Sequence, residues 1–188
     1  LFRENFMKIG INGLGRIGRA IFRRAMETSD FEILVINEKN PDLENICYTL
    51  NYDTIYGPLD PKVKVSKDCL EFDDGKKIAV FNFPQINDVP WQEYGVNYVI
   101  EATGVLKNTE DSRKLIENNI CERVFITHSP KQFVDFTMVL GCNEHKLDPK
   151  KHFVIASSIC DATAIAPVVE LLDQKIGIKN GQITTLHP

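Results

Sequence analysis

In the first forty residues, the pattern of apolar and polar positions changes from that of a strand to that of a helix and back to that of a strand. An apolar run around Ile9 and Ile11 leads into a glycine-rich turn, a helix-compatible segment covers residues 19–26, and a second apolar run covers residues 31–37. Short apolar runs bounded by turn residues indicate buried strands, and a helix between two of them is typical of a βαβ unit. The pattern therefore predicts that the chain begins with a parallel sheet.

The same alternation continues along the rest of the chain. Helical spacing predicts helices over residues 42–50, from Asn108 or Thr109 to Asn118, and around residues 165–172, ending near Gly177. Strands are predicted at residues 62–65, 70–72, 78–81, 96–100, 124–127, 136–140 and 153–156. Many short strands with helices between them predict an α/β fold: a doubly wound, mostly parallel sheet with an antiparallel hairpin at one edge.

Composition and charge exclude several classes of protein. With 43% hydrophobic and 26% charged residues, the 188-residue chain has the composition of a globular protein. Its net charge of −4 disfavours nucleic acid and anionic membranes as partners. No apolar run approaches the ~20 residues of a membrane span, so we expect a cytoplasmic protein. The five cysteines are odd in number and form no C-x-x-C pair, which argues against a disulfide framework and a metal site.

Three glycines give the first turn a specific chemical meaning. Gly13, Gly15 and Gly18 have the spacing G-x-G-x-x-G, which allows a tight turn, a close approach of backbone to a pyrophosphate, and close packing of helix on strand. Glu38 follows the second strand, twenty residues after Gly18. A carboxylate there accepts hydrogen bonds from ribose hydroxyls and repels a 2′-phosphate, so a Rossmann-type domain that binds NAD rather than NADP is predicted. The alternatives are an ordinary glycine-rich turn and a solvated loop glutamate.

A second turn at the end of a predicted strand contains Thr103 and Gly104. In doubly wound sheets, ligands bind at the carboxyl ends of the strands. We therefore expect both residues to face the same crevice as Gly13, although a simple strand-to-helix turn has the same composition.

Cys160 is the candidate nucleophile. It precedes an apolar helix, whose positive end stabilises a thiolate. His187 follows the strand-like residues 183–186, so the two side chains can converge as nucleophile and general base. A buried, inert cysteine and a solvated histidine are the alternatives; His128 and His145 compete as bases from loops, and His152 is expected to open a strand.

Together these motifs resemble the glyceraldehyde-3-phosphate dehydrogenases. The matching segments are residues 8–19, 37–38, 51–57, 101–104, 141–143, Cys160 with residues 166–167, and residues 184–187, so the resemblance extends from Met7 to His187. The separation of Cys160 and His187 is also that of the family.

The resemblance implies an NAD-dependent, phosphorylating aldehyde dehydrogenase of glycolysis that acts through a thiohemiacetal and a thioester on Cys160, with His187 as the base. It implies an NAD-binding domain over residues 7–157, the start of a catalytic domain over residues 158–188, and a homotetramer when the chain is of full length. The residues implied in binding NAD are Asn12, Gly13, Gly15, Arg16, Ile17, Gly18, Glu38, Thr103, Gly104 and Thr127.

The residues on either side of Cys160 depart from the family. Ile159 and Asp161 stand where the family has hydroxyl side chains that help to bind the attacking phosphate. A carboxylate beside an incoming dianion repels it, so the alternatives are a different aldehyde without phosphorolysis and a non-catalytic dinucleotide-binding paralogue. A Rossmann-type reductase or sugar dehydrogenase of another family explains the glycines but not the Cys160–His187 spacing. Because the family continues through a second domain, the chain is expected to be a fragment with a truncated catalytic domain, inactive by itself.

Overall fold

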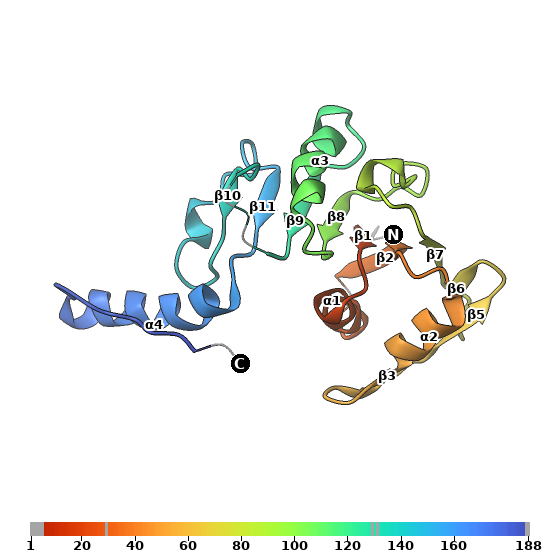
Figure 1. Ribbon diagram of the computed structural model, residues 1–188, viewed down its shortest axis with the longest axis horizontal. Helices are drawn as coiled ribbons and strands as arrows, with labels where there is room; N and C mark the ends of the chain where they lie inside the picture. Colours follow the sequence, from red (N-terminus) through yellow and green to blue (C-terminus); the bar gives the residue numbers. More distant parts are fainter. Residues whose placement is uncertain (1–5, 29, 129, 131, 187–188) are drawn as a thin grey trace, which may run out of the picture.

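A nine-stranded sheet organises the protein, as the computed structural model shows (Figure 1). The structure describes residues 6–28, 30–128, 130 and 132–186. In sheet order, the strands are β10 (Phe136–Thr137), β11 (Val154–Ala156), β9 (Arg123–Ile126), β8 (Tyr98–Glu101), β1 (Met7–Asn12), β2 (Phe31–Asn37), β7 (Lys77–Phe81), β6 (Cys69–Phe72) and β5 (Val63–Ser66). All pairings from β10 to β7 are parallel, and those of β6 with β7 and with β5 are antiparallel. The predicted α/β class and the antiparallel edge are thus confirmed.

Four α-helices and a small hairpin complete the described chain. The helices are α1 (Arg16–Met26), α2 (Leu43–Asn51), α3 (Leu106–Glu117) and α4 (Cys160–Ile176), and two short 3-10 helices cover Ile86–Asp88 and Glu144–Lys146. The hairpin pairs β3 (Tyr52–Asp53) with β4 (Gly57–Pro58). None of the helices in the described residues is long and apolar enough to cross a membrane.

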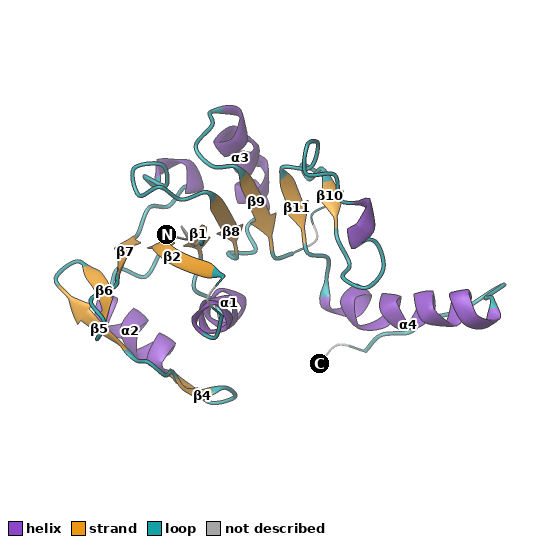
Figure 2. Cartoon of the chain, turned by 180° about the vertical axis from the view of Figure 1, so that it is seen from behind, coloured by secondary structure: helices purple, strands orange, loops and turns teal. Residues whose placement is uncertain are grey.

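Both faces of the sheet are covered, as the doubly wound prediction requires. Figures 1 and 2 show α1 and α2 on one face and α3 on the other. The first face buries Ile11 and Phe22, whereas the second buries Val99, Leu115 and Trp91. The connector before β8 is anchored by Trp91, which is fully buried and whose Nε1 donates to the carbonyl of Ile86 at 2.8 Å.

Several element boundaries differ from those predicted. Helix α1 begins at Arg16, not at residue 19, because Gly15 itself is the N-cap and the helix starts directly after the turn. The strand predicted at residues 183–186 is wrong: residues 177–186 form no strand in the described part of the chain, because nothing described there supplies a pairing partner.

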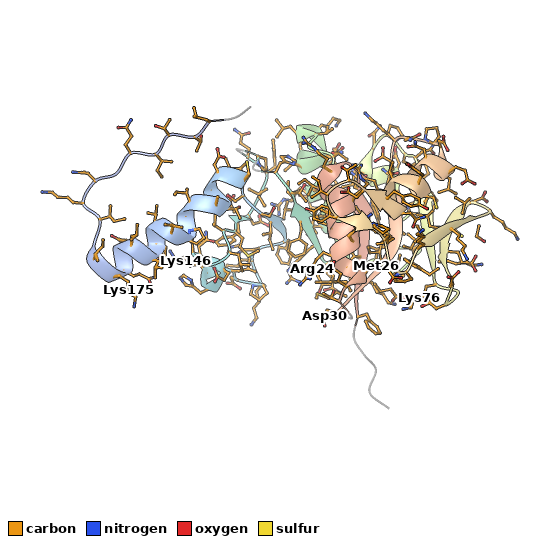
Figure 3. All side chains as sticks on the ribbon, turned by 90° about the horizontal axis from the view of Figure 1, so that it is seen from below. Arg24, Met26, Asp30, Lys76, Lys146 and Lys175 are labelled. Atoms are coloured by element: carbon orange, nitrogen blue, oxygen red, sulfur yellow. The ribbon has the colours of Figure 1, made fainter. Side chains whose placement is uncertain are left out.

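Helix α4 extends away from the sheet. None of its residues is buried, and Figure 3 shows its C-terminal half projecting from the rest of the protein. Its first half stays close to the preceding loop, because a Cβ on Gly141 would lie 3.6 Å from Cβ of Pro167. The helix begins at Cys160, which confirms the prediction that this residue lies near a helix N-terminus.

Candidate functional site

The turn between β1 and α1 forms the centre of a crevice at the carboxyl ends of the parallel strands. Gly13 has a φ of +94°, and a Cβ there would lie 2.8 Å from Cγ2 of Thr103. A Cβ on Gly18 would lie 2.0 Å from the carbonyl oxygen of Gly13, so helix and turn are in direct contact. Gly15 differs, because a Cβ there would meet nothing within 4 Å. Two glycines are therefore required by packing, and the third borders open space.

The first turn of α1 offers unpaired backbone donors beside this space. Gly15 is the N-cap, no side chain caps the helix, and no acidic residue lies in its first turn. Arg16 and Ile17 are exposed there. The N–H groups and the positive end of the helix dipole are thus available to an anion.

Glu38 lies on the opposite side of the turn. Its Oε2 accepts a hydrogen bond from the Leu14 N–H at 2.7 Å, and its Oε1 accepts one from the Asn40 N–H at 3.2 Å. A carboxylate has about four acceptor positions, so the half-buried side chain keeps capacity for two further donors. Two vicinal hydroxyl groups would match that capacity.

The crevice has a volume of about 360 Å³. It brings together five of the predicted cofactor residues: Asn12, Gly13, Gly15, Glu38 and Thr103. Its remaining lining residues are Leu14, Asn37, Lys39, Phe83, Pro84, Ala102, Val105 and Asn108.

Two other predicted cofactor residues lie next to this crevice rather than in its wall. Gly104 follows Thr103 with a φ of +72°, and Thr127 follows β9, where its N–H donates to the carbonyl of Glu101 at 3.0 Å. Sequence reasoning missed Asn37 and Phe83; their positions at or just after the ends of strands were the available signal.

A chain of polar side chains forms the floor of the crevice. The amide of Asn37 pairs with the backbone of Phe83 in both directions, and its Nδ2 also donates to Oδ1 of Asn12 at 2.7 Å. Nδ2 of Asn12 donates to Oε2 of Glu101, and both the N–H and the hydroxyl of Thr103 donate to Oε1. Asn12 is 2% exposed, and both ends of its amide are engaged within the protein.

Glu101 is the buried titratable group of this site. Its side chain is completely inaccessible. Burial raises the pKa of the Glu101 carboxyl, whereas the hydrogen bonds from Thr103 and Asn12 act in the opposite direction.

Cys160 is the first residue of α4 and is exposed. It follows β11, which is parallel to β9, β8 and β1, so the thiol emerges from the edge of the sheet that holds the crevice. The thiol donates to Oδ1 of Asp161 at 3.6 Å, and the N-cap residue Ile159 is 46% exposed. His187 lies outside the described residues, so its pairing with Cys160 stays a prediction.

Of the three other histidines, His128 and His152 have structural contacts. Nε2 of His128 lies 3.1 Å from Oγ1 of Thr109, and burial lowers the pKa of His128. His152 stacks on Phe136, and its Nδ1 accepts a hydrogen bond from the Asp148 N–H at 3.0 Å. His145, the other competing base, lies in the short 3-10 helix Glu144–Lys146.

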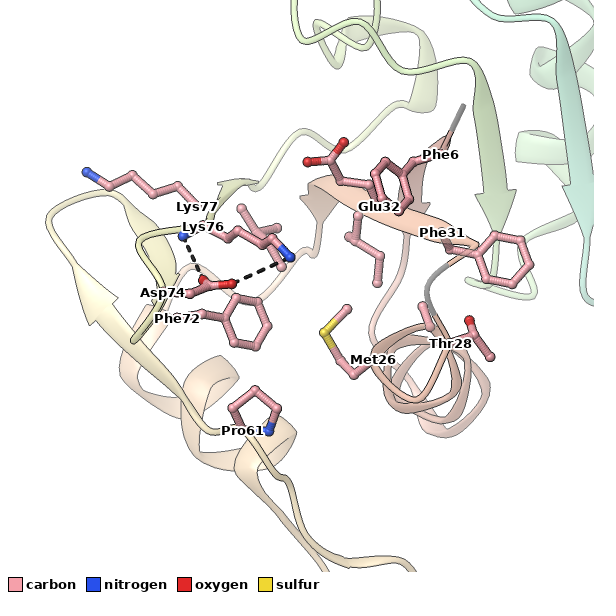
Figure 4. A pocket seen from close by; sticks show the side chains of 13 residues that line it. Phe6, Met26, Thr28, Phe31, Glu32, Pro61, Phe72, Asp74, Lys76 and Lys77 are labelled. Atoms are coloured by element: carbon pink, nitrogen blue, oxygen red, sulfur yellow. Dashed lines mark hydrogen bonds and ion pairs between the residues drawn. The ribbon is translucent and has the colours of Figure 1, made fainter. Parts of the chain in front are cut away.

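A second cavity of about 340 Å³ lies at the amino ends of β1 and β2 (Figure 4). Its walls are mainly apolar, with Met26 and Phe72 facing each other across it, and Lys76 and Asp74 form an ion pair at its rim. It contains none of the predicted site residues, and it lies at the C-terminal end of α1, where the dipole disfavours anions.

These features define the class of the protein. A parallel sheet whose first strand ends in a glycine turn, with an uncapped helix N-terminus and an acidic side chain after the second strand, is a dinucleotide-binding Rossmann domain. The family model for the glyceraldehyde 3-phosphate dehydrogenase NAD-binding domain matches residues 7–109, more than half of the chain. The chain therefore belongs to the glyceraldehyde-3-phosphate dehydrogenase family, and its cofactor is NAD.

Curated relatives agree with this assignment. Glyceraldehyde-3-phosphate dehydrogenase 2 of Streptomyces avermitilis is 40% identical over 182 residues, which are 96% of this chain and 53% of that protein. Glyceraldehyde-3-phosphate dehydrogenase 2 of Bacillus subtilis is 36% identical over 181 residues, 96% of this chain and 52% of that protein. The enzyme of Thermotoga maritima is 37% identical, with 96% of this chain and 53% of that protein covered. The chain spans about half the length of these relatives.

Proposed function

We propose that residues 7–157 form the NAD-binding domain of an NAD-dependent aldehyde dehydrogenase and that residues 158–188 open its catalytic domain. The observation that carries the proposal is the position of Cys160, at the N-terminus of α4 and at the sheet edge that holds the glycine turn. A nucleophile and a dinucleotide crevice at one edge suit a reaction in which a covalently held substrate is oxidised.

The crevice fits NAD on its own geometry. The open space at Gly15 and the N–H groups of Arg16 and Ile17 would receive the pyrophosphate, with Gly13 and Gly18 shaping the turn below. The free acceptor positions of Glu38 would bind the ribose hydroxyls. Further along the strand ends, Thr103, Gly104 and Thr127 would border the rest of the cofactor, with Asn12 beneath it. When bound, NAD supplies the hydride acceptor for the oxidation.

The remaining chemistry belongs to Cys160 and His187. The sulfur of Cys160 would form a bond to the aldehyde carbon, and its proton would pass to the imidazole of His187. The imidazolium would return this proton to the former aldehyde oxygen, which gives a thiohemiacetal and leaves His187 neutral. The hydroxyl group of the thiohemiacetal would then lose its proton to His187 as the carbon is oxidised, which leaves a thioester on Cys160. An acyl acceptor would then attack the thioester carbon and break its bond to sulfur, which releases an acyl phosphate if the acceptor is phosphate and an acid if it is water. The sulfur would take back the proton held by His187, which restores the thiol.

The surroundings of Cys160 favour a second candidate, an aldehyde dehydrogenase that does not use inorganic phosphate. Ile159 presents an apolar side chain and Asp161 a carboxylate in direct contact with the thiol. An acidic group repels an attacking phosphate dianion, whereas it does not repel water. In either case, three properties stay predictions: the substrate is an aldehyde, the protein is a homo-oligomer, and its location is cytoplasmic.

NAD-linked oxidation of glyceraldehyde 3-phosphate by the protein that carries this chain tests the proposal. The reaction would be followed with and without phosphate, for the wild type and for Cys160→Ser, with Cys69→Ser as the matched control because Cys69 lies on strand β6, away from the crevice. We expect turnover that Cys160→Ser abolishes and Cys69→Ser preserves. Turnover that needs no phosphate would favour the second candidate, and turnover that survives in Cys160→Ser would contradict the proposed nucleophile.

A further inference from the structure

A continuous line of hydrogen bonds connects four neighbouring strands beneath the crevice. In the sheet the strands lie in the order β7, β2, β1, β8. Their carboxyl ends contribute, in the same order, the backbone of Phe83, Asn37, Asn12 and Glu101, and the line ends at Thr103. Such a line spans the crevice from the side of Glu38 to the turn before α3.

The backbone of Phe83 determines the direction of these hydrogen bonds at one end. Its N–H donates to Oδ1 of Asn37 at 2.8 Å, and its carbonyl accepts from Nδ2 at 3.0 Å. Asn37 must therefore present a donor to Asn12, whose oxygen accepts it and whose Nδ2 faces Glu101. Turning either amide over would place two donors or two acceptors against each other.

Thr103 determines the direction of the hydrogen bonds at the other end of the line. Its Oγ1 accepts from the Val105 N–H at 3.1 Å and from Nδ2 of Asn108 at 3.0 Å. Both acceptor positions of the hydroxyl are then occupied, so its single proton points to Glu101, as does the Thr103 N–H at 2.8 Å. Donors thus converge on position 101 from both sides, and a carboxylate is a side chain that only accepts.

We propose that Glu101 is a positioning residue for NAD, whose carboxylate locks the amide of Asn12 and the turn at Thr103 and so preforms the floor of the crevice. The inference rests on the proposed function, because NAD must lie in this crevice for the floor to matter. A floor that is ordered before binding lowers the entropy cost of binding. Glu101 itself touches no ligand, since it is completely buried.

The direction of the hydrogen bonds supplies a sharp test. In Glu101→Gln, the new amide can be placed in two ways. Its Nε2 faces either Nδ2 of Asn12 or the two donors of Thr103, so two donor groups face each other in both cases. The double variant Asn12→Asp with Glu101→Gln moves the carboxylate one position along the line. The carboxylate at position 12 would then accept from Asn37 and from the new amide at position 101, whose oxygen would accept from Thr103. Every hydrogen bond is restored, and the net charge equals that of the wild type.

NAD affinity and thermal unfolding would be measured for the wild type and both variants, by calorimetry and circular dichroism. We expect Glu101→Gln to bind NAD roughly tenfold more weakly at a temperature where it is folded, and the double variant to recover most of that affinity. Asp135→Asn is the matched control, because Asp135 also accepts several hydrogen bonds, from Arg113 and from the Phe153 and Val154 N–H groups, but lies outside the crevice. It should lower the melting temperature and leave NAD affinity unchanged.

Each outcome has a defined meaning. Unchanged NAD affinity in Glu101→Gln, or a double variant that binds no better than Glu101→Gln, would overturn the proposal. If Glu101→Gln does not fold, the double variant decides: a folded chain with NAD affinity close to that of the wild type supports the proposal, and one that does not fold or bind contradicts it. A wild type that fails to bind NAD would instead refute the proposed function.

Discussion

Two cavities of nearly equal volume lie at opposite edges of one sheet. The crevice at the carboxyl ends measures about 360 Å³ and the cavity at the amino ends about 340 Å³. The crevice at the carboxyl ends is bordered by the N-terminus of α1, by the open space at Gly15 and by a line of buried polar side chains. The cavity at the amino ends is bordered by the last turn of α1 and lined by apolar side chains such as Phe72 and Met26. Volume alone therefore does not distinguish a dinucleotide site in this protein.

The two cavities differ in the polar groups that converge on them. Parallel strands end at one edge, so the side chains that follow them collect there, as Glu38 and Thr103 do. The helix dipole adds to the asymmetry, because its positive end faces only the carboxyl edge. Substitutions that disturb one cavity and spare the other can test this comparison.

Gly18→Ala should have the largest effect. The added Cβ would lie 2.0 Å from the Gly13 carbonyl oxygen, and the obstacle is backbone rather than a flexible side chain. We expect a loss of about 3 kcal/mol in the free energy of unfolding and no measurable NAD binding. Gly75→Ala is the control in the hairpin beside the other cavity, where a Cβ meets no atom within 4 Å and the cost is only that of a φ of +85°. Chemical denaturation and NAD titration would check both; normal NAD affinity in Gly18→Ala would contradict the assigned turn geometry.

Glu38→Ala should have an intermediate effect on NAD binding, accompanied by a small loss of stability because the Leu14 and Asn40 N–H groups lose their acceptor. Removing the carboxylate removes two hydrogen-bond acceptors for hydroxyl groups and the charge that repels a 2′-phosphate. We expect roughly tenfold weaker NAD binding and a smaller preference for NAD over NADP. Glu32→Ala, beside the other cavity, should change neither affinity. Equal losses in the two variants, measured by titration with NAD and NADP, would show that the effect is not local to the crevice.

The smallest effect is a dependence of stability on pH that arises at the carboxyl edge. The folded pKa of His128 lies below the ordinary value of 6.5 because of burial. The unfolded chain therefore binds the proton first, so stability is complete above about pH 6.5 and falls as the pH decreases through the folded pKa. In thermal melts between about pH 7.5 and 5, His128→Gln should lose less stability than the wild type. Lys76→Ala, at the exposed ion pair of the other cavity, should show the same dependence of melting temperature on pH as the wild type. The same dependence in all three proteins would contradict the assignment of this effect to His128.

Local signals in the sequence predicted much of the fold. The spacing of Gly13, Gly15 and Gly18 identified the turn, and residues 31–37 matched β2 from end to end. The helix predicted over residues 42–50 is α2, Leu43–Asn51, and the structure shows Asp42 as its N-cap. These features depend on neighbours in sequence, where residue type and spacing carry the information.

Contacts between distant segments were not predictable in the same way. The hairpin at residues 70–81 was expected, but β7 also pairs in parallel with β2 and joins the hairpin to the main sheet. The pairing of Asn37 with Phe83 joins residues 46 positions apart. Nothing in the residues around Glu101 indicated that donors approach it from both sides. Side-chain partners at strand ends depend on strand order, and the sequence pattern does not contain that order.

The most direct test of the central claim is NAD affinity in Gly15→Ala, compared with Gly181→Ala. Neither glycine has a positive φ, and an added Cβ meets no atom within 4 Å at either position. Both variants should therefore fold, because alanine lowers the entropy of the unfolded chain. Gly15→Ala should lose no more than about 1 kcal/mol of stability, since alanine is a poorer N-cap than glycine. If the space at Gly15 holds the pyrophosphate, Gly15→Ala should bind NAD at least roughly tenfold more weakly, while Gly181→Ala binds like the wild type. Wild-type affinity in Gly15→Ala would contradict the placement of NAD in this crevice.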